Sequence, residues 1–372
     1  MKLPSLALLM FVLIFGCTSQ TEKTIPHTES DVLNEFVASA PVQYLSLDDT
    51  PIQYIHLNDD NIIFSTKNEY LNQEVIVSRI SDFIYFNERF YIYDNFQFSV
   101  FQIQKNGTIS GPFTSKGRGP GEHLVVTSLN NNSRYIYLTD LNNARINVYN
   151  EDMTYVHEIG SIKGFFKTQY IDLNDKIMLF SNPNNAGFMP NSPDEGLIVV
   201  SPIEKYEETI TTILPRIIPN GYQPQVYNSP NFSVNRKNEI AASYAPLPWV
   251  FLFDEKYSLK LTLVLEYSLF KEMNIPKMDF FKPKGNEGYG GAMPFRQFTL
   301  LDNGDLFISI LNELIHISFD KNQQKYIVKA RYQFIMDSHN YSLWVSNIYR
   351  SNDGTEFYAG NWDYLFRFSL LK

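Results

Sequence analysis

A pair of short apolar strands, joined by a loop, recurs six times along most of the chain. The six pairs are 90–94 with 98–103, 135–140 with 145–149, 176–180 with 197–200, 239–244 with 249–253, 305–310 with 314–319, and 356–360 with 364–368. Most pairs are preceded by another apolar segment, at 75–80, 124–129, 168–173, 295–301 or 343–349. Most are followed by a fourth, at 108–113, 155–159, 209–214, 259–266 or 324–332. Four short strands repeated every 40 to 65 residues or so, about one blade each, are typical of β-propellers.

Blades stack around an axis because a single blade cannot bury both of its faces. We therefore predict an all-β fold over residues 41–372: a six-bladed β-propeller of four-stranded antiparallel blades. A pair of β-sandwiches is the alternative, and six matches to the blade pattern argue against it. The sixth unit lacks a fourth strand, which would leave an unpaired edge. We expect an N-terminal strand at about 52–57 to pair outside 364–370 and close the ring, with 42–47 as the rival candidate.

The composition suits strands and disfavours polyanionic partners. The chain has 29 Phe and 24 Tyr, and residues of this kind favour strands over helices. The formal net charge of −9 argues against a nucleic-acid partner. We expect a monomer that needs no cofactor.

The first residues have the pattern of an export signal. A basic start at Lys2 precedes an apolar run over 6–15, which ends in Gly16-Cys17. A small residue before a cysteine at this point resembles a bacterial lipobox, so we expect a signal peptide over 1–17 and a lipid on Cys17. The alternative is an ordinary secretory signal with an incidental cysteine. Cys17 is the only cysteine, which excludes an internal disulfide or a thiolate metal site.

Residues 18–40 are polar, and we expect a flexible tether there, with a short helical turn over 31–36. The expected location is the cell envelope, as an outer-membrane lipoprotein that touches the membrane only through its anchor. Residues 18–22 contain one acidic residue, Glu22, so the sequence leaves open which side of the membrane the protein faces.

The most distinctive loop spans residues 115–123, with three glycines and a proline between 117 and 121. Such a segment cannot be a helix or a central strand, and we expect it to connect the first two blades. Arg118 has two interpretations. It reaches the central axis and binds a carboxylate or sulfate, or it pairs with Glu122 and stiffens the loop.

Three segments resemble a known family. Gly117-Arg118-Gly119-Pro120-Gly121-Glu122 is similar to the Gly-x-Gly-Pro-Gly-Glu loop of six-bladed β-propeller lipoproteins of Bacteroidota. Arg145-Ile146-Asn147-Val148-Tyr149 resembles part of an NHL-type repeat, and 53–57 resembles the family's segment before the first blade. The resemblance covers about 42–372. It implies a non-enzymatic propeller of the cell envelope, of a kind that often accompanies polysaccharide-utilisation machinery, and it implies no substrate.

Strand order predicts two unlike faces. The second-to-third loops of each blade and the connections between blades lie on one side, and the other turns lie opposite. The opposite turns are short and polar, at 105–107, 150–152, 254–256 and 320–322. The first set is long, at 115–123, 181–196, 215–230, 245–248, 271–294 and 337–342, with a shorter loop at 361–363. We call its side the long-loop face.

Long loops on a rigid scaffold are the usual place for a binding site. The candidate ligand-binding residues on this face are Arg118, Glu122, Tyr222, Tyr227, Tyr289, His339, Tyr341, Asn361, Trp362 and Asp363. Aromatic rings beside amides and carboxylates suit a glycan, and they equally suit a partner protein. The alternative is that these aromatic side chains pack only against their own loops.

No catalytic or metal-binding motif is evident. Asp94 and Asp140 end their strands in equivalent places, which indicates structural turns, and His316 alternates with apolar residues as a packed histidine does. The leading hypothesis is a non-catalytic, lipid-anchored binding propeller. The rivals are a polysaccharide lyase or hydrolase, and a structural scaffold of an outer-membrane complex.

Overall fold

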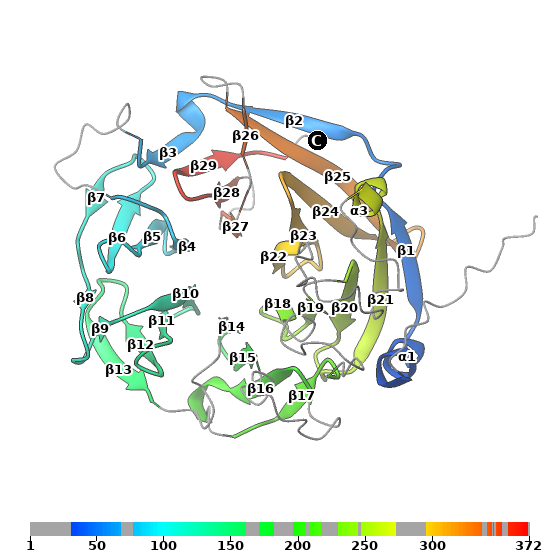
Figure 1. Cartoon of the computed structure of the whole chain (residues 1–372), viewed down its shortest axis with the longest axis horizontal. Helices are drawn as coiled ribbons and strands as arrows, with labels where there is room; N and C mark the ends of the chain where they lie inside the picture. Colours follow the sequence, from blue (N-terminus) through cyan, green and yellow to red (C-terminus); the bar gives the residue numbers. More distant parts are fainter. Residues whose placement is uncertain are drawn as a thin grey trace, which may run out of the picture.

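In the computed structural model, six antiparallel sheets stand around a central axis (Figure 1). The predicted six-bladed, all-β propeller is thereby confirmed. The structure describes residues 31–67, 77–160, 171–181, 196–205, 208–216, 230–244, 247–272, 295–336, 341–343, 345, 347–351 and 356–370.

Each blade is a meander whose first strand lies nearest the axis and whose fourth lies at the outer edge (Figure 1). Blade one consists of β4 (Asp82–Phe86), β5 (Arg89–Asp94), β6 (Ser99–Gln104) and β7 (Ile109–Ser110). Blade two consists of β10 (Val126–Asn131), β11 (Ile136–Asp140), β12 (Arg145–Tyr149) and β13 (Tyr155–Ile159). Blade three consists of β14 (Ile171–Leu173), β15 (Ile177–Ser181), β16 (Ile198–Pro202) and β17 (Thr211–Ile213). A 3₁₀ helix, η5 (Ile203–Lys205), follows β16.

The other three blades carry the N-terminal strands. Blade four consists of β18 (Pro230–Val234), β19 (Ile240–Tyr244), β20 (Trp249–Phe253) and β21 (Leu259–Glu266). Blade five consists of β22 (Phe295–Leu300), β23 (Leu306–Ile310), β24 (Glu313–Asp320) and β25 (Lys325–Met336). Blade six consists of β27 (Asn347–Arg350), β28 (Phe357–Gly360) and β29 (Tyr364–Phe368), with β3 (Ile62–Ser65) as its fourth strand. A short strand, β26 (Tyr341–Leu343), pairs with β25.

The middle strands form because both of their faces are buried between blades. Every residue of β11, β12, β19, β20 and β23 is buried. Aromatic side chains fill the space between blades, as between blades five and six, where the rings of Phe334 and Phe368 lie 4.8 Å apart. The high Phe and Tyr content that favours strands is therefore also the material of the inter-blade core.

The ring is closed by an N-terminal strand, as predicted, but the strand is not the expected one. β3 pairs antiparallel with β29, opposite residues 364–366. The segment 52–57 forms β2 (Ile52–Leu57), which adds in parallel to the outer edge of β25, and the rival 42–47 forms β1 (Val42–Ser46), which adds in parallel to β21. The 12-residue β25 offers a long open edge that β2 covers. The 3₁₀ helix η1 (Asp59–Asn61), capped by Asn58, joins β2 on blade five to β3 on blade six.

Two first strands also differ from the sequence prediction. Blade one starts at Asp82 rather than within 75–80, because the Ser78 and Arg79 main-chain amides donate to the Asp94 carboxylate instead of to a neighbouring strand. Blade six starts at Asn347, and Leu343 belongs to β26. Val77 and Ile80 are buried, which explains why an apolar pattern alone suggested a strand there.

The last part of the expected tether packs on the propeller. α1 (Asp31–Ala38) includes the helical turn expected over 31–36, and its Leu33 and Val37 are fully buried against blade four. The Phe36 ring lies 5.5 Å from that of Phe251. A second short helix, α3 (Ser268–Glu272), follows β21. Neither helix in the described ranges is long and apolar enough to cross a membrane.

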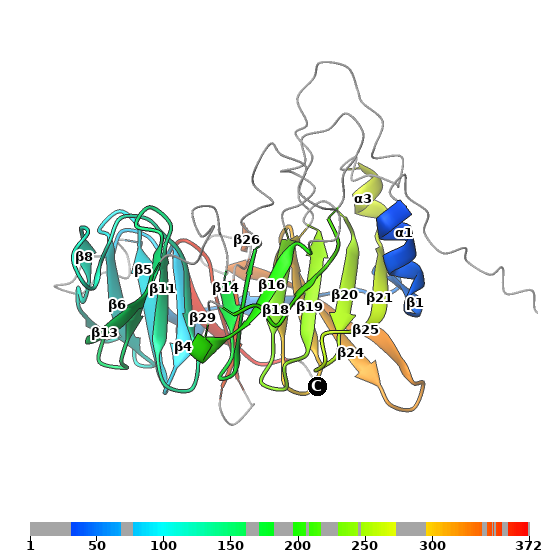
Figure 2. The same ribbon diagram turned by 90° about the horizontal axis from the view of Figure 1, so that it is seen from below.

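The observed strand order places the two fully described loops of the long set, 115–123 and 361–363, on one side of the propeller, as predicted. Beyond β7, the Ser99 hydroxyl donates to the Thr114 carbonyl, so the chain reaches the end of blade one where β6 begins. The loop 115–123 therefore leaves from the same side as the β28–β29 loop at 361–363. In Figure 2 this long-loop face is at the top with α1 and α3, and the β24–β25 turn extends at the bottom.

Candidate functional site

A cavity of about 1300 Å³ runs along the propeller axis and is lined by all six innermost strands. Its wall is rich in short polar side chains, which include Asp82, Thr127, Ser128, Asn130, Asp172, Asn231, Ser233, Gln297 and Thr299. We call this cavity the central channel. Trp362 is part of its lining and comes from the long-loop face.

The wall of the channel is fixed by hydrogen bonds that pass from one blade to the next. In each case a side chain on an innermost strand bonds the main chain of the following innermost strand. The bonds are Leu129 N–H to Asp82 Oδ2 at 2.7 Å, Asn130 Nδ2–H to the Ile171 carbonyl at 2.7 Å, Val234 N–H to Asp172 Oδ2 at 2.8 Å, and Leu300 N–H to Ser233 Oγ at 3.2 Å. Main-chain groups at strand edges, which would lack a hydrogen-bond partner in an isolated blade, gain one in this way.

Asp172 has the most perturbed carboxyl group in this wall. Burial raises its pKa to about 6, although the main-chain amides of Val234 and Leu173 and the Ser233 hydroxyl stabilise the ionised form. Its charge therefore changes close to neutral pH, within the channel.

Trp362 projects at the mouth of the channel on the long-loop face. Its side chain is 49% exposed, and the Arg79 guanidinium carbon lies 3.7 Å from its ring centroid. The main chain beneath is held because Ile80 N–H donates to the Trp362 carbonyl at 2.8 Å. The two segments meet only because ring closure brings blade six beside blade one.

The neighbours of Trp362 shape the turn that presents it. Asn361 is buried, and its side-chain oxygen accepts from the main-chain amides of Asp363 and Tyr364. The Asp363 carboxylate accepts from the Thr66 hydroxyl and pairs with Lys67 at 3.0 Å. Of the three predicted ligand residues in this loop, Trp362 is the exposed one.

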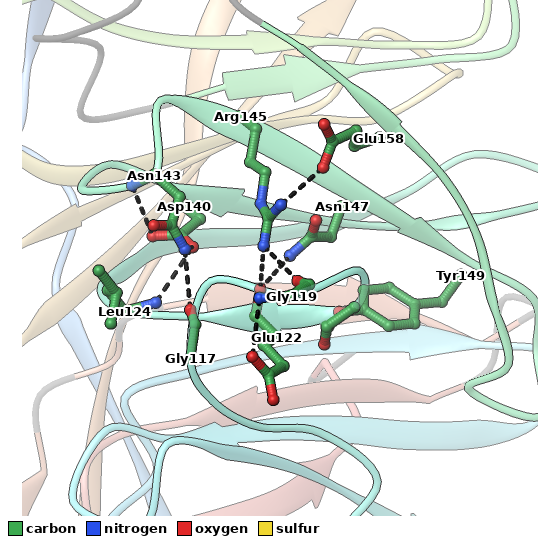
Figure 3. Close-up of polar contacts among 11 residues, drawn as sticks. Gly117, Gly119, Glu122, Leu124, Asp140, Asn143, Arg145, Asn147, Tyr149 and Glu158 are labelled. Atoms are coloured by element: carbon green, nitrogen blue, oxygen red, sulfur yellow. Dashed lines mark hydrogen bonds and ion pairs between the residues drawn. The ribbon is translucent and has the colours of Figure 1, made fainter.

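The glycine-rich loop is bound to blade two by the other motif of the family resemblance (Figure 3). The Arg145 guanidinium pairs with Glu158 at 2.6 Å and donates to the carbonyls of Gly119 and Glu122. Further bonds from side chains on or beside β12 complete the attachment: Asn143 to the Gly117 carbonyl, Asn147 to the Glu122 carbonyl, and Tyr149 to the Gly121 carbonyl. The two sequence motifs are thus one structural unit.

The glycines of this loop make room for the Glu122 side chain. A Cβ atom on Gly117 would lie 1.9 Å from Glu122 Oε2, and the Gly119 amide donates to that oxygen at 2.7 Å. Gly121 has a φ of +73°, which favours glycine. The carboxylate of Glu122 therefore caps its own loop.

Arg118 fits neither interpretation drawn from the sequence. Its side chain is exposed and forms no ion pair with Glu122 or any other described residue, because Glu122 turns inward to the glycine amide. It is not among the residues lining the channel. Figure 1 places β8 (Ser115–Lys116) and β9 (Glu122–His123), which flank it, at the outer edge of the ring, so Arg118 does not reach the axis.

The structural interpretations of the buried polar residues are confirmed. Asp94 accepts from the amides of Phe96 and Gln97, and Asp140 accepts from those of Leu124 and Val125. His316 is buried, stacks on Phe307 with ring centroids 4.4 Å apart, and lies 3.1 Å from the Asp305 carboxylate. Burial alone would raise the pKa of Asp305, but hydrogen bonds from His316 and Ser318 outweigh it and hold the pKa at about 2.

Several predicted residues lie outside the described part of the chain: Cys17, Tyr222, Tyr227, Tyr289 and His339. Tyr341 begins β26, and its side chain is also outside the description. Among the residues that are described, no three His, Cys, Asp or Glu side chains come together as metal ligands.

Sequence reasoning missed Arg79 and the channel residues. Asp82 and Asp172 share only a place near the start of a first strand, directly before an apolar residue. Arg79 has no such signal, because its partner Trp362 comes from the far end of the chain.

No protein-family model and no curated protein matches this sequence. Among solved structures, the chain is similar to a "putative exported protein" of Bacteroides fragilis, with 14% identity, a TM-score of 0.56, and coverage of 89% of this chain and 100% of that one. It is also similar to U3-55K, at 8% identity and a TM-score of 0.48 over 84% of this chain and 99% of that one. For virginiamycin B lyase of Staphylococcus aureus the identity is 12% and the TM-score 0.41, over 78% and 80% of the two chains. At these identities the likeness shows the propeller fold alone.

Proposed function

We propose that this protein is a lipid-anchored, non-catalytic binding propeller of the bacterial cell envelope, and that it binds a glycan where the central channel opens on the long-loop face. The observation that carries the proposal is the half-exposed ring of Trp362 beside a channel lined by amides and hydroxyls. A sugar packs its C–H face on an aromatic ring and directs its hydroxyls to such polar groups.

Two channel residues support a polar ligand. Thr127 Oγ1 and Asn231 Nδ2 are buried within the wall, and neither has a hydrogen-bond partner among the described residues. Buried polar atoms are normally bonded, so a rotation of these two side chains would turn an unsatisfied group toward a ligand hydroxyl in the channel, which both residues line. The fixed cross-blade bonds hold them in place in advance, which lowers the entropic cost of binding.

The envelope location rests on the N-terminal pattern, with Cys17 as the lipidated residue, and on the family resemblance of the glycine-rich loop. The similar Bacteroides fragilis structure, described as exported, agrees with it. Replacement of Cys17 by Ala is expected to abolish incorporation of labelled fatty acid and to release the protein from membranes.

The binding proposal is tested on a glycan array, followed by calorimetry with the glycans that bind. Trp362→Ala is expected to weaken binding at least about tenfold, or about 1.4 kcal/mol, because the stacking surface is lost. Phe96→Ala is the matched control, since Phe96 is 64% exposed in the β5–β6 loop of the same face and does not line the channel. Binding of no glycan, with one stable protein partner co-purifying instead, would overturn the glycan proposal.

A further inference from the structure

Arg79 is an arginine without a carboxylate partner at the mouth of the channel. Its guanidinium lies over the Trp362 ring, its Nε is buried, and this nitrogen has no hydrogen-bond partner in the described part of the chain. The Arg79 side chain is half-buried, so water only partly replaces the missing partner. Of the five N–H donors of a guanidinium, the Nε–H of Arg79 is buried, so a ligand would bind the donors on the two terminal nitrogens.

The carboxylate beside Arg79 is already occupied. Asp94 receives the Arg79 main-chain N–H, but its oxygens also accept from the amides of Ser78, Phe96 and Gln97 and from the Gln97 side chain. It is fully buried and serves as the centre of the β5–β6 turn. The Asp94 carboxylate therefore holds the main chain of the turn and does not pair with the positive charge of the Arg79 guanidinium.

Five other described arginines are paired, whereas Arg118 and Arg134 have no ion pair with a described carboxylate. Arg89, Arg145, Arg236, Arg331 and Arg367 each have a carboxylate oxygen within 4 Å. The chain as a whole carries nine more negative than positive charges, so a partner for Arg79 would have been easy to supply. A half-buried arginine that lacks one, on an aromatic ring that lines a cavity, is suited to an anion from outside the protein.

We infer that Arg79 and Trp362 together recognise an acidic sugar, whose carboxylate or sulfate the guanidinium binds while the sugar ring lies on Trp362. The Arg79 guanidinium lies over the indole ring, and the Trp362 side chain is 49% exposed, so a sugar can reach the solvent-exposed part of that side chain. The Arg79 N–H groups border that surface, and a planar guanidinium binds two oxygens of an anion at once. This inference rests on the proposed glycan-binding function and names its ligand class.

The test uses the full chain and three probes measured by calorimetry: an oligogalacturonate, the same oligosaccharide after carboxyl reduction, and a sulfated galactan oligosaccharide. The wild type is expected to bind an acidic probe at least tenfold more tightly than the reduced one, with an affinity that falls as salt rises. Preference for the oligogalacturonate or for the sulfated probe identifies which anion the site takes.

Arg79→Met keeps the aliphatic stem and removes the charge. It is expected to abolish the preference for the acidic probe and to change affinity for the reduced probe less than twofold. Arg79→Lys keeps the charge without the planar fork, and an intermediate preference is expected. Arg118→Met is the matched control, because Arg118 lies on the same face at the outer edge of the ring and should not affect any of the affinities.

The outcomes separate this inference from the function on which it rests. If Arg79→Met and the wild type show the same ratio of acidic to neutral affinity, the inference is wrong and glycan binding stands. If the wild type binds neutral glycans only, the acidic ligand class is likewise excluded. If it binds no glycan at all, the proposed function and the inference both fail. Should Arg79→Met not fold, Arg79→Lys decides, since an unchanged ratio in that variant contradicts bidentate recognition.

Discussion

The glycine-rich loop at 115–123 and the channel mouth at Trp362 lie on the same face, and each has an arginine held close to it. At the loop, Arg145 is bound to two carbonyls and to Glu158. At the mouth, Arg79 lies over an aromatic ring and has no ion pair with a described carboxylate. The first arginine is thus bound to a carboxylate and to main-chain carbonyls, and the second is not. The distinctive motif is therefore a joint between blades, and the ligand site that we propose lies in residues that form no motif.

The largest expected effect is on stability and comes from removing Arg145, which attaches the glycine-rich loop to blade two. Arg145→Ala removes the ion pair with Glu158 and the bonds to the Gly119 and Glu122 carbonyls, although Asn147 still donates to the Glu122 carbonyl. We expect a loss of about 3 kcal/mol of unfolding free energy, because each charge-assisted bond contributes roughly 1.5–3 kcal/mol. Urea denaturation of the full chain measures it. Arg145→Lys, which keeps one charged donor, should lose less. A loss below 0.5 kcal/mol or so would show that the loop is not held by this residue.

A second effect concerns the channel wall and depends on pH. The folded-state pKa of Asp172, about 6, lies above its unfolded value of 3.8, so the folded protein binds the proton more tightly. Its contribution to stability is therefore greatest below pH 4 and is lost as pH rises to 6, by at most about 3 kcal/mol at 1.36 kcal/mol per pH unit.

Asp172→Asn should flatten the stability profile between pH 4 and 6 in denaturation experiments. Asp305 provides an internal reference, because its pKa is depressed to about 2 and its contribution is lost only as pH falls below its unfolded value of 3.8. If the unfolding free energy of Asp172→Asn still falls between pH 4 and 6 as it does in the wild type, another group causes that pH dependence.

A smaller effect tests the fit of the loop. Gly117→Ala would force the Glu122 carboxylate away from its hydrogen bond with the Gly119 amide, and we expect a loss of about 1–2 kcal/mol. Gly160→Ala is the matched control, since a Cβ there meets nothing within 4 Å. Equal stability of the two variants would mean that Glu122 finds another position at no cost.

The smallest expected effect is that of Arg118→Ala. Arg118 is exposed and has no ion pair with a described residue, so unfolding free energy should change by less than about 0.5 kcal/mol. A loss above about 1 kcal/mol would restore the structural role that the sequence suggested for it. The same variant should also leave glycan affinity unchanged.

Both faces of each middle strand are buried, so each of these strands is a run of mostly apolar residues. The blades are therefore well predicted from the sequence. β13 and β21 match their predicted ranges, and β11 and β12 lie within theirs. Ring closure is harder to predict, since β1, β2 and β3 are all short and apolar and each adds to the edge of a different blade. The pairing of Arg79 with Trp362 depends on that closure, so no local pattern indicates it.

Chain order gives the closing strands a further consequence. The strands β1, β2 and β3 are made by the ribosome before any of their partners, because β21, β25 and β29 come near the end of synthesis. These three segments cannot pair with their native partners until most of the propeller has been made. Completion of the ring is therefore a late event in folding, and the Arg79–Trp362 pair forms only in molecules that have reached it.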